Sequence, residues 1–573
     1  MHFNWDNDIR TPWLGSYGEV PFHLEYSDKS MSGAVLETAA KDPDFPALSF
    51  MGRTIPYKEM AAEIDRVARA FYALGVRPGH RVLVCLPNVP QAIYCLYGLN
   101  RIGAVASMVH PLSAVAEIAF YLNEAGCDIA VTLDQFYAKF LEVRQLRPIR
   151  KLIIARVSEE LRFPLSLGQK LLTERKFPKV VEDGSTLLWK HFIEAGASAP
   201  DAIYPQKDPL TEAVVLFSGG TTGVTKGIML SDLNFNALAR QTEAMCHKEV
   251  RHGRMLAAMP VFHGFGLGVC IHTVLVCDAT AILVPRFNVK SYAKLIRKTQ
   301  PNFIAGVPTL FEAITCNRYL DGADLSCLRG VFSGGDSLTI ELKKKFDKFL
   351  ADHKATIRVR EGYGTTECVT ASCLTPYNKE KEGSIGLPFP DTVYAIVKPD
   401  TAEFLPPNTE GEIILKGPTL MTGYLKHPEE TAETLRVLPD GDTWLYTGDL
   451  GYMDEDGYVY FRQRLKRLII TNGYNIYPGQ LENIIDSCPE VAYSCVIGVK
   501  DPRRMQKVKA FIVPREGETP GEALRERIME QLRLHIAKYA LPREIEFRSE
   551  LPKTLVGKVA YRLLEEEEAR KSA

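Results

Sequence analysis

Short apolar runs alternate with longer amphipathic stretches from about residue 55 to about residue 345. Because parallel strands need a long crossover connection, usually a helix, this alternation predicts parallel sheets covered by helices. The fold class is therefore predicted to be α/β, with a large N-terminal lobe of stacked, mostly parallel sheets. The predicted strands are RVLVCLP (81–87), GAVASMVHP (103–111), IAVTL (129–133), KLIIA (151–155), ATAILVP (279–285), NFIAGVP (302–308) and RGVFSGGDS (329–337).

The pattern of apolar, polar and turn residues changes twice in the last third of the sequence. From about 384 to 462, short alternating strands are separated by Pro and Gly turns, which predicts an antiparallel sheet or a small β-barrel-like subdomain. After RQRLKR (462–467) comes a compact α+β pattern, with strands near RLIIT, CVIGVK and VKAFIVP and helices at GQLENIIDSC and GEALRERIMEQLRLHIAKYA. We therefore expect an N-terminal domain over 1–465 and a small C-terminal domain over 466–573.

Length and charge narrow the class of protein. A chain of 573 residues exceeds one compact core, so about two to four domains are expected. Hydrophobic residues make up 46% and charged residues 24%, which is ordinary for a soluble globular protein. The formal net charge of -1 removes the bulk electrostatic case for nucleic acid as a partner.

No segment predicts secretion or a membrane span. The start, MHFNWDNDIR, lacks a basic region followed by an apolar core. The longest apolar stretch (267–284) is broken by His272 and Asp278 and lies among alternating strands and helices, so it is predicted to be a buried element. The segment 156–205 is interpreted as an insertion over the surface, for which contact with the periphery of a membrane stays open.

The cysteine and histidine pattern does not predict a metal site. The twelve cysteines are scattered without a CxxC pair, which is typical of reduced core residues in a cytoplasmic protein. His247 and His252 flank a charged turn without metal-ligand spacing, so surface polarity is the expected explanation for both. The sequence makes no prediction of an oligomer.

The strongest chemical signal is LFSGGTTGVTKG (216–227), where an apolar run enters a loop that ends in a single lysine. Its glycines let successive backbone N–H groups point into one concavity, which favours an anion, and one serine and three threonines add hydroxyl donors. The loop can therefore hold a polyphosphate. It is not the common P-loop, in which Lys precedes Ser or Thr, and GIMLS (227–231) predicts another strand after it. A solvated linker is the alternative interpretation.

Four further motifs carry reactive side chains, and each alone has a plain structural alternative. EGYGTTE (361–367) offers a ring for a nucleobase, a hydroxyl for a phosphate and a carboxylate for Mg²⁺, yet an isolated stretch of this kind is only a turn. WLYTGDL (444–450) places an aspartate where it can accept from two sugar hydroxyls, although Gly-Asp turns are common. RQRLKR is most simply a solvated face, and Lys558 in ELPKTLVGKVAYR (550–562) a loop lysine.

Together, in this order and spacing, the motifs resemble the adenylate-forming superfamily, which includes acyl-CoA synthetases and luciferases. Within it, the sequence is most similar to bacterial long-chain fatty acid–CoA ligases. The resemblance implies that the small C-terminal domain is mobile and turns on a hinge at Lys466. Besides the motifs above, it rests on PWLGSYGEVPFHLEY (12–26), MPVFHGFGLGV (259–269) and GSIGLPFPDT (383–392).

The same resemblance implies which residues bind ATP. A phosphate loop, the wall of the adenine and acyl pocket, and the contacts to base and ribose would each come from a different motif. These are Ser218, Gly219, Gly220, Thr221, Thr222, Gly223, Thr225 and Lys226 for the phosphates; Gly334, Gly335 and Asp336 for the wall; and Gly362, Tyr363, Gly364, Thr365, Asp449 and Arg464 for base and ribose.

The resemblance further implies the catalytic residues. Thr366 would contact the α-phosphate of ATP, and Glu367 would hold Mg²⁺. His263 matches a position near the substrate carboxylate. Lys558 would bridge that carboxylate and the α-phosphate during adenylation. Because Lys558 then occupies the place where a thiol must arrive, we expect rotation about the hinge to withdraw it and to present the Gly473 loop to coenzyme A, the second co-substrate.

The chain departs from the family pattern at three places. Ser231-Asp232 stands where Thr-His is common, Gln480 replaces a glutamate, and Gln463 replaces Gly or Asp before Arg464. The second change puts a local contact of the small domain in doubt, and the third puts the hinge turn in doubt. None of the three removes a reactive group.

The substrate is less well defined than the reaction. Three glycines in GFGLGV (264–269) suit either a wall that leaves a channel open for an alkyl chain or close backbone packing. The resemblance favours fatty acids. The alternatives are an aryl or other small-carboxylate CoA ligase, a ligase that loads a carrier protein and an oxygenase of the luciferase kind. A non-catalytic ATP-binding regulator is disfavoured, because the reactive groups are all present.

Overall fold

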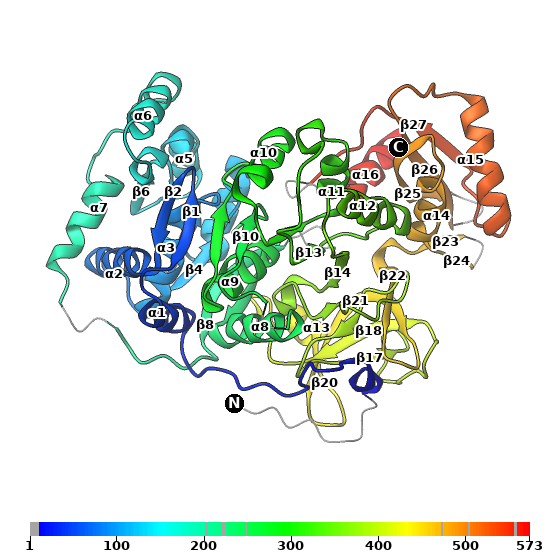
Figure 1. The fold of residues 1–573 in the computed structure, drawn as a ribbon, viewed down its shortest axis with the longest axis horizontal. Helices are drawn as coiled ribbons and strands as arrows, with labels where there is room; N and C mark the ends of the chain where they lie inside the picture. The colour runs from blue at the N-terminus through cyan, green and yellow to red at the C-terminus, as the bar shows by residue number, and fades with distance from the viewer. Residues whose placement is uncertain are drawn as a thin grey trace.

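The computed structural model describes residues 11–200, 204–218, 225–247, 249–471, 474–501, 505–554 and 559–572. Two large mixed sheets with helices, an antiparallel sheet and a smaller α+β unit at the C-terminal end make up the molecule (Figure 1). The α/β fold class is therefore confirmed.

The first large sheet has the strand order β19-β9-β8-β4-β3-β5-β6-β7. From β8 to β7 its neighbours are parallel, while β9 pairs antiparallel with both β8 and β19. The strand predicted directly after the phosphate loop is confirmed as β9. The bounds are β3 Arg81–Cys85, β4 Val105–Met108, β5 Ile129–Leu133, β6 Lys151–Ala155, β7 Thr186–Leu188, β8 Glu212–Ser218, β9 Lys226–Ser231 and β19 Gly423–Tyr424.

The second large sheet has the order β16-β15-β14-β13-β12-β10-β11-β1-β2. Its interior pairs from β14 to β1 are parallel, and only its two edges are antiparallel. All seven strands predicted from the apolar runs lie in one of these two sheets. The bounds are β1 Pro46–Phe50, β2 Arg53–Pro56, β10 Arg254–Ala257, β11 Thr280–Leu283, β12 Phe303–Gly306, β13 Gly330–Ser333, β14 Val359–Tyr363, β15 Cys373–Leu374 and β16 Leu387–Pro388.

Two helices fill the core between the large sheets. In α3 (Pro90–Arg101) and α8 (Asp232–Met245) nearly every side chain is buried, as expected of a helix that is covered on all sides. One apolar cluster joins them to residues of both sheets, including Leu48, Val84 and Ala257. The other helices of the two layers are α1 Met31–Lys41, α2 Tyr57–Ala73, α4 Val115–Glu124, α5 Tyr137–Leu146, α6 Leu165–Lys176, α7 Trp189–Ala195, α9 Thr273–Val276, α10 Val289–Thr299, α11 Pro308–Thr315 and α12 Ile340–Asp352.

The apolar stretch 267–284 is buried, as predicted. It forms part of a π-helical segment (Phe265–His272), helix α9 and strand β11, all inside the core. Within the described ranges, no helix combines the length and the apolar character needed to cross a membrane.

Residues 393–464 form a five-stranded antiparallel sheet, as the alternating pattern predicted. An N-terminal segment straps this sheet to the large lobe: Trp13 is fully buried against it, and the carboxylate of buried Asp391 accepts from Leu24 N–H and Tyr26 O–H at 2.8 and 2.7 Å. The bounds are β17 Val393–Val397, β18 Gly411–Lys416, α13 Pro428–Thr434, β20 Leu435–Val437, β21 Thr443–Met453 and β22 Val459–Arg464.

The C-terminal α+β unit has the strand order β24-β23-β26-β25, with β27 added beside β26. Its predicted strands and helices are confirmed, except that α15 stops at His535 instead of continuing to Ala540. Ile536 is already extended, and Pro542 disfavours a helix just before it. The bounds are β23 Ile469–Thr471, β24 Tyr474–Ile476, α14 Pro478–Asp486, β25 Val491–Asp501, β26 Met505–Pro514, α15 Glu522–His535, β27 Glu544–Phe547 and α16 Tyr561–Ser572.

Replacing Asp391 tests the N-terminal strap. Asp391→Ala leaves the buried Tyr26 hydroxyl and the partly buried Leu24 N–H without this acceptor, so we expect a loss of about 2–5 kcal/mol in unfolding free energy. The matched control, Asp44→Ala, removes an exposed carboxylate that pairs only with exposed Lys58, and such a change is expected to stay within about 0.5 kcal/mol. Urea denaturation of both variants measures the difference, and equal midpoints would contradict the role of Asp391.

Candidate active site

The candidate site lies where β8 ends. The register pairs Ser218, the last residue of β8, with Lys226, the first of β9, so both ends of the phosphate loop are fixed by the sheet. Thr225 is half-buried beside them. The other predicted loop residues, Gly219, Gly220, Thr221, Thr222 and Gly223, lie outside the described residues, as does the side chain of Ser218.

Lys226 reaches across to the segment that carries β19 and α13. Its Nζ lies 4.7 Å from the centroid of the Tyr424 ring and 3.9 Å from Glu430 Oε1. Tyr424 in turn donates a hydrogen bond of 2.8 Å from its hydroxyl to Glu367 Oε1. Burial, and next the charge of Glu367, raise the pKa of Tyr424 far above its ordinary value, so this hydroxyl stays protonated and orients the carboxylate.

The backbone around Glu367 is held tightly. Glu367 lies in a short 3₁₀ turn (Thr366–Cys368), and its carbonyl accepts from Met421 N–H at 2.8 Å. The two residues that follow the turn, Val369 and Thr370, have φ values of 54° and 80°, which β-branched residues rarely adopt. Such strain persists only where the surroundings over-determine it, so the turn is a fixed element of the site.

A second group of side chains forms around Asp449, which lies in β21. Tyr363, the last residue of β14, belongs to this group. The hydroxyl of Tyr363 donates to Asp449 Oδ2 at 2.7 Å, and Arg464 Nε lies 3.5 Å from Asp449 Oδ1. Asp449 and Arg464 face each other in the register of β21 and β22. Burial, followed by the charge of Asp449, raises the pKa of Tyr363, while Asp449 raises that of Arg464. The sheet therefore presents a buried carboxylate between a phenol and a guanidinium.

Glycines separate this group from an apolar cavity. Gly334 and Gly362 are neighbours, since a Cβ on Gly334 would lie 3.3 Å from the Gly362 carbonyl oxygen. Both line a narrow cavity of about 40 Å³, together with Gly335. Its apolar wall is formed by Phe265, Val269, Phe332, Ala371, Leu374 and Phe389. Two predicted site residues lie nearby: Gly364 leaves no room for a side chain against the Thr370 backbone, and Thr365 is buried. Asp336 is exposed beyond Gly335.

His263 stands at the start of the π-helical segment. Its backbone N–H donates to Pro260 O at 3.1 Å, and its Nδ1 accepts from Phe265 N–H at 3.2 Å. Packing explains the glycines that follow: a Cβ on Gly264 would overlap Thr370 Oγ1, and one on Gly266 would overlap the Pro260 carbonyl oxygen. The side chains between these glycines, not the glycines themselves, form the cavity wall.

The C-terminal unit contributes cations to the same place. Partial burial, and next the charges of Lys226 and Arg562, lower the pKa of Lys466. Tyr561, next to Arg562, has its ring 4.8 Å from the Arg467 guanidinium carbon. The start of α16 therefore lies close to the phosphate loop. Lys558 and Gly473 lie outside the described residues, but Lys553 and Val559 form a β-bridge that brackets the Lys558 loop just before α16.

Sequence reasoning missed three of these residues. Tyr424, Arg562 and Glu430 reach the site through contacts with residues far from them in the chain, and none belongs to a motif that stands out alone. For Arg562 one signal was present, because it falls four residues after Lys558 in the same C-terminal motif.

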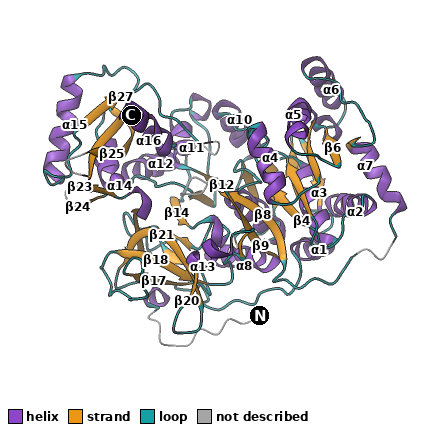
Figure 2. Ribbon diagram, turned by 180° about the vertical axis from the view of Figure 1, so that it is seen from behind, coloured by secondary structure: helices purple, strands orange, loops and turns teal. Residues whose placement is uncertain are grey.

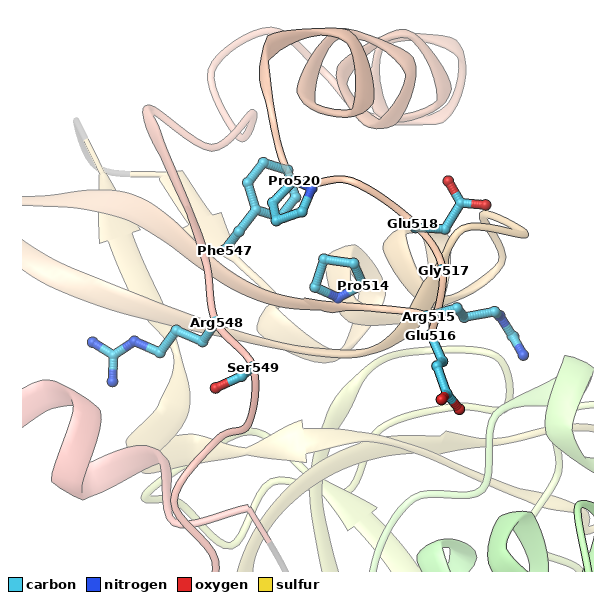
Figure 3. Close-up of a pocket in the computed structure, with 9 residues that line it drawn as sticks. All are labelled: Pro514, Arg515, Glu516, Gly517, Glu518, Pro520, Phe547, Arg548 and Ser549. Carbon is cyan, nitrogen blue, oxygen red and sulfur yellow. The ribbon is translucent and has the colours of Figure 1, made fainter.

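A hollow of about 320 Å³ in the C-terminal unit holds none of the predicted site residues. It lies between the ends of β26 and β27, where Pro514, Pro520 and Phe547 face one another (Figure 3). The Arg548 side chain extends away from them and binds Glu567 through two hydrogen bonds of 2.6 and 2.9 Å.

One side-chain group in the described ranges has metal-ligand geometry. Asp42, His252 and Asp278 place their ligand atoms within 4.8 Å of one another. Arg251 Nε lies 3.3 Å from Asp278 Oδ2, so a cation of the protein itself already balances this carboxylate. The sequence-based interpretation of His252 as a polar surface residue stays a prediction.

The chain belongs to the AMP-binding enzyme family. The family model of the AMP-binding enzyme matches residues 35–425, and that of the AMP-binding enzyme C-terminal domain matches residues 480–558. The predicted membership is confirmed, and the chain is an enzyme of this family.

Relatives and solved structures agree with this assignment. A long-chain-fatty-acid–CoA ligase of Bacillus subtilis is 34% identical over 97% of this chain and 98% of its own length. A 4-coumarate–CoA ligase-like protein of Arabidopsis thaliana is 30% identical over 90% of this chain and 86% of its own length. ATP-bound MatB from Rhodopseudomonas palustris superposes with a TM-score of 0.79, at 25% identity, over 94% of this chain and 99% of that structure.

The glycine at position 266 gives a test of the packing. Gly266→Ala forces a methyl group against the Pro260 carbonyl, and overpacking of this kind typically destabilises by about 1–3 kcal/mol. Gly168→Ala in α6 is the matched control, because no atom lies within 4 Å of its added Cβ and alanine favours a helix. We expect a lower Tm for the first variant only. If neither variant lowers the Tm, close packing does not explain Gly266, and the alternative of an open channel beside these glycines is favoured.

The pKa of Lys466 gives a test of the cation cluster. A polyphosphate favours the protonated lysine, so its binding raises a pKa that burial, and next the neighbouring cations, lower in the free protein. Loss of the Lys466 proton should therefore weaken the binding of tripolyphosphate. The affinity should fall with rising pH over the window between the lowered pKa of Lys466 in the free protein and its higher pKa in the complex. Titration calorimetry at several pH values measures this. Lys466→Arg keeps the charge without titrating, so it should remove its share of the pH dependence. An unchanged profile would contradict the cluster.

Proposed function

We propose that the protein is an ATP-dependent, AMP-forming carboxylate–CoA ligase that acts on medium- or long-chain fatty acids. One observation carries the proposal: Lys226 of the phosphate loop and Arg562 of the C-terminal unit lie close enough to Lys466 that their charges, after burial, lower its pKa. Glu433 raises this pKa without offsetting the decrease, so the place keeps a positive potential that attracts a triphosphate.

The side chains present fit ATP and its metal ion. Buried Asp449, held by Tyr363 and Arg464, is an acceptor for vicinal ribose hydroxyls. Lys226 and the phosphate loop would hold the β- and γ-phosphates, and Thr366 would hold the α-phosphate. Glu367, a hard oxygen ligand oriented by Tyr424, would hold Mg²⁺, which neutralises phosphate charge when bound.

In the first half-reaction the substrate carboxylate oxygen attacks the α-phosphorus, and pyrophosphate leaves. The carboxylate is already ionised, so no general base is required. The obstacle is repulsion between the substrate carboxylate and the triphosphate, and positively charged groups positioned in the site would reduce this repulsion. Lys558 would bridge the carboxylate and the α-phosphate, and the position of Arg562 beside Lys466 supports its delivery to this place.

In the second half-reaction the coenzyme A sulfur attacks the acyl carbon, its proton is lost, and AMP leaves. Since Lys558 would block the thiol, we propose that 466–573 moves as a domain against 1–465, with Lys466 as hinge and 384–462 as a β-rich subdomain of the larger part. Gln463 beside the hinge supports this: it is 2% exposed, and neither atom of its amide has a hydrogen-bond partner among the described residues. An unpaired buried amide destabilises this arrangement relative to one that pairs it.

The cavity beside Gly334 and Gly362 supports an apolar acyl group. Its wall is almost entirely hydrophobic, and His263 stands at the start of the segment that forms one side. The 34% identical fatty acid–CoA ligase relative supports a long chain. The phenylalanines in the wall and the 30% identical 4-coumarate–CoA ligase-like relative favour an aryl carboxylate as the second candidate substrate.

We also propose that the protein acts in the cytoplasm and contacts a membrane at its periphery. The twelve cysteines all lie in the described ranges and are all free thiols, which supports a reducing compartment. A long-chain acid is poorly soluble in water, so a membrane surface is the natural source of such a substrate.

Separate half-reactions test the division of labour between two lysines. Lys558→Ala should abolish acyl-adenylate formation yet leave thioester formation from supplied acyl-adenylate largely intact. Lys466→Pro should show the reverse pattern, because the hinge can no longer turn. Pyrophosphate release and thioester yield measure the two steps. Equal loss of both steps in Lys558→Ala would refute the assignment.

The reaction itself is tested by supplying ATP, Mg²⁺, coenzyme A and a pool of acetate, octanoate, palmitate and benzoate. We expect mass spectrometry to detect chiefly octanoyl- or palmitoyl-CoA, with one AMP formed per thioester. Benzoyl-CoA as the main product would select the aryl candidate. AMP formation without any thioester would overturn coenzyme A as the acceptor.

A further inference from the structure

Helix α6 carries a group of exposed apolar side chains at the edge of the molecule. Phe163, two residues before α6, is 79% exposed, and Leu165 and Leu167 in its first turn are 59% and 49% exposed. Val181, five residues after the helix ends, is 62% exposed. Figures 1 and 2 both place α6 at the end of the molecule opposite the C-terminal unit. Its main packing partner is the short turn Val157–Glu160. We call residues 161–181 the α6 protrusion.

The protrusion is also basic. Its sequence contains five lysines and arginines and one glutamate, whereas the whole chain has a net charge of -1. Arg162, Lys176 and Lys179 are exposed. The protrusion therefore combines apolar side chains with an excess of positive charge, the composition of segments that lie in a membrane interface.

The acidic residues that flank the protrusion are engaged by the body of the protein. Glu160 is buried, with Oε2 2.8 Å from Arg53 Nη1. Glu182 accepts from Leu188 N–H, and Asp183 accepts from Thr186 N–H, each at 2.8 Å. Glu160 is thus paired with a cation of the body, whereas Glu182 and Asp183 keep their charge at the base. The positive charge available to a ligand is therefore that of the exposed Arg162, Lys176 and Lys179.

We propose that the α6 protrusion docks the protein on an anionic lipid bilayer. Phe163, Leu165 and Leu167 insert among the acyl chains at the headgroup boundary, and Arg162, Lys176 and Lys179 bind lipid phosphates. A protein partner fits less well, because a specific interface covers about 800 Å² on each side and these three side chains lie within five consecutive residues.

Docking on a bilayer is independent of the ligase reaction. Only its benefit, access to a membrane-dissolved acid, rests on the proposed function. Vesicle binding and ligase activity therefore fail separately: a protein that binds vesicles but forms no thioester retains the docking surface and loses the proposed function. A protein that forms thioesters but binds no vesicles retains the ligase function and loses the docking surface.

Flotation of the full chain with vesicles tests the proposal. We expect binding to phosphatidylglycerol–phosphatidylcholine vesicles, weaker binding at high salt, and little binding to phosphatidylcholine alone. Joint replacement Phe163→Ser, Leu165→Ser and Leu167→Ser should lower the partition coefficient by about tenfold or more. Joint replacement Arg162→Glu, Lys176→Glu and Lys179→Glu should lower binding to the anionic vesicles only.

The matched control is the joint replacement Phe404→Ser, Val437→Ser and Leu534→Ser, three side chains that are 47%, 70% and 73% exposed elsewhere. It should bind vesicles like the unaltered protein. All variants should form octanoyl-CoA at the unaltered rate in vesicle-free solution, which verifies folding. The proposal is overturned if the unaltered protein does not bind anionic vesicles. That result is expected if the α6 protrusion instead binds an acidic protein. Equal binding by the α6 and control variants also overturns it.

Discussion

Repulsion among like charges is the constraint on which the site depends. Lys226 at the start of β9, Lys466 after β22 and Arg562 in α16 come from separate parts of the chain, yet after burial it is the charges of Lys226 and Arg562 that lower the pKa of Lys466. Protein carboxylates at this place, such as Glu430 at 3.9 Å from Lys226, compensate the cluster only in part, since the pKa of Lys466 stays lowered. Under the proposed function, a bound polyphosphate would compensate the rest.

The rest of the fold determines which side chains would surround a bound polyphosphate. Parallel pairing brings the ends of β13 and β14 together in the second large sheet, and the antiparallel sheet adds Asp449 and Arg464 from neighbouring strands. Tyr363 and Tyr424 act as fixed donors to Asp449 and Glu367, because burial keeps their hydroxyls protonated. Carboxylates with fixed donors are oriented before any ligand arrives, which is what positioning and charge neutralisation require.

The sequence predicted the sheets well, because short apolar runs bounded by turn residues are a local signal, and β3, β5, β6 and β9 fall where those runs stand. The residues of EGYGTTE and WLYTGDL that meet, Tyr363 and Asp449, were also identified. Contacts that join distant parts of the chain were not predicted: Tyr424 with Glu367, and Arg562 with Lys466. The glycines after His263 were ambiguous, because only the packed structure places Pro260 and Thr370 against them.

The most direct measurement is the distance between the two parts of the molecule during the reaction. Spin labels at exposed Lys348 of α12 and Arg527 of α15 would report it by pulsed electron resonance. The account predicts one distance with a non-hydrolysable ATP analogue and a clearly different one when acyl-adenylate and coenzyme A are supplied. A single unchanged distance distribution under both conditions would contradict it.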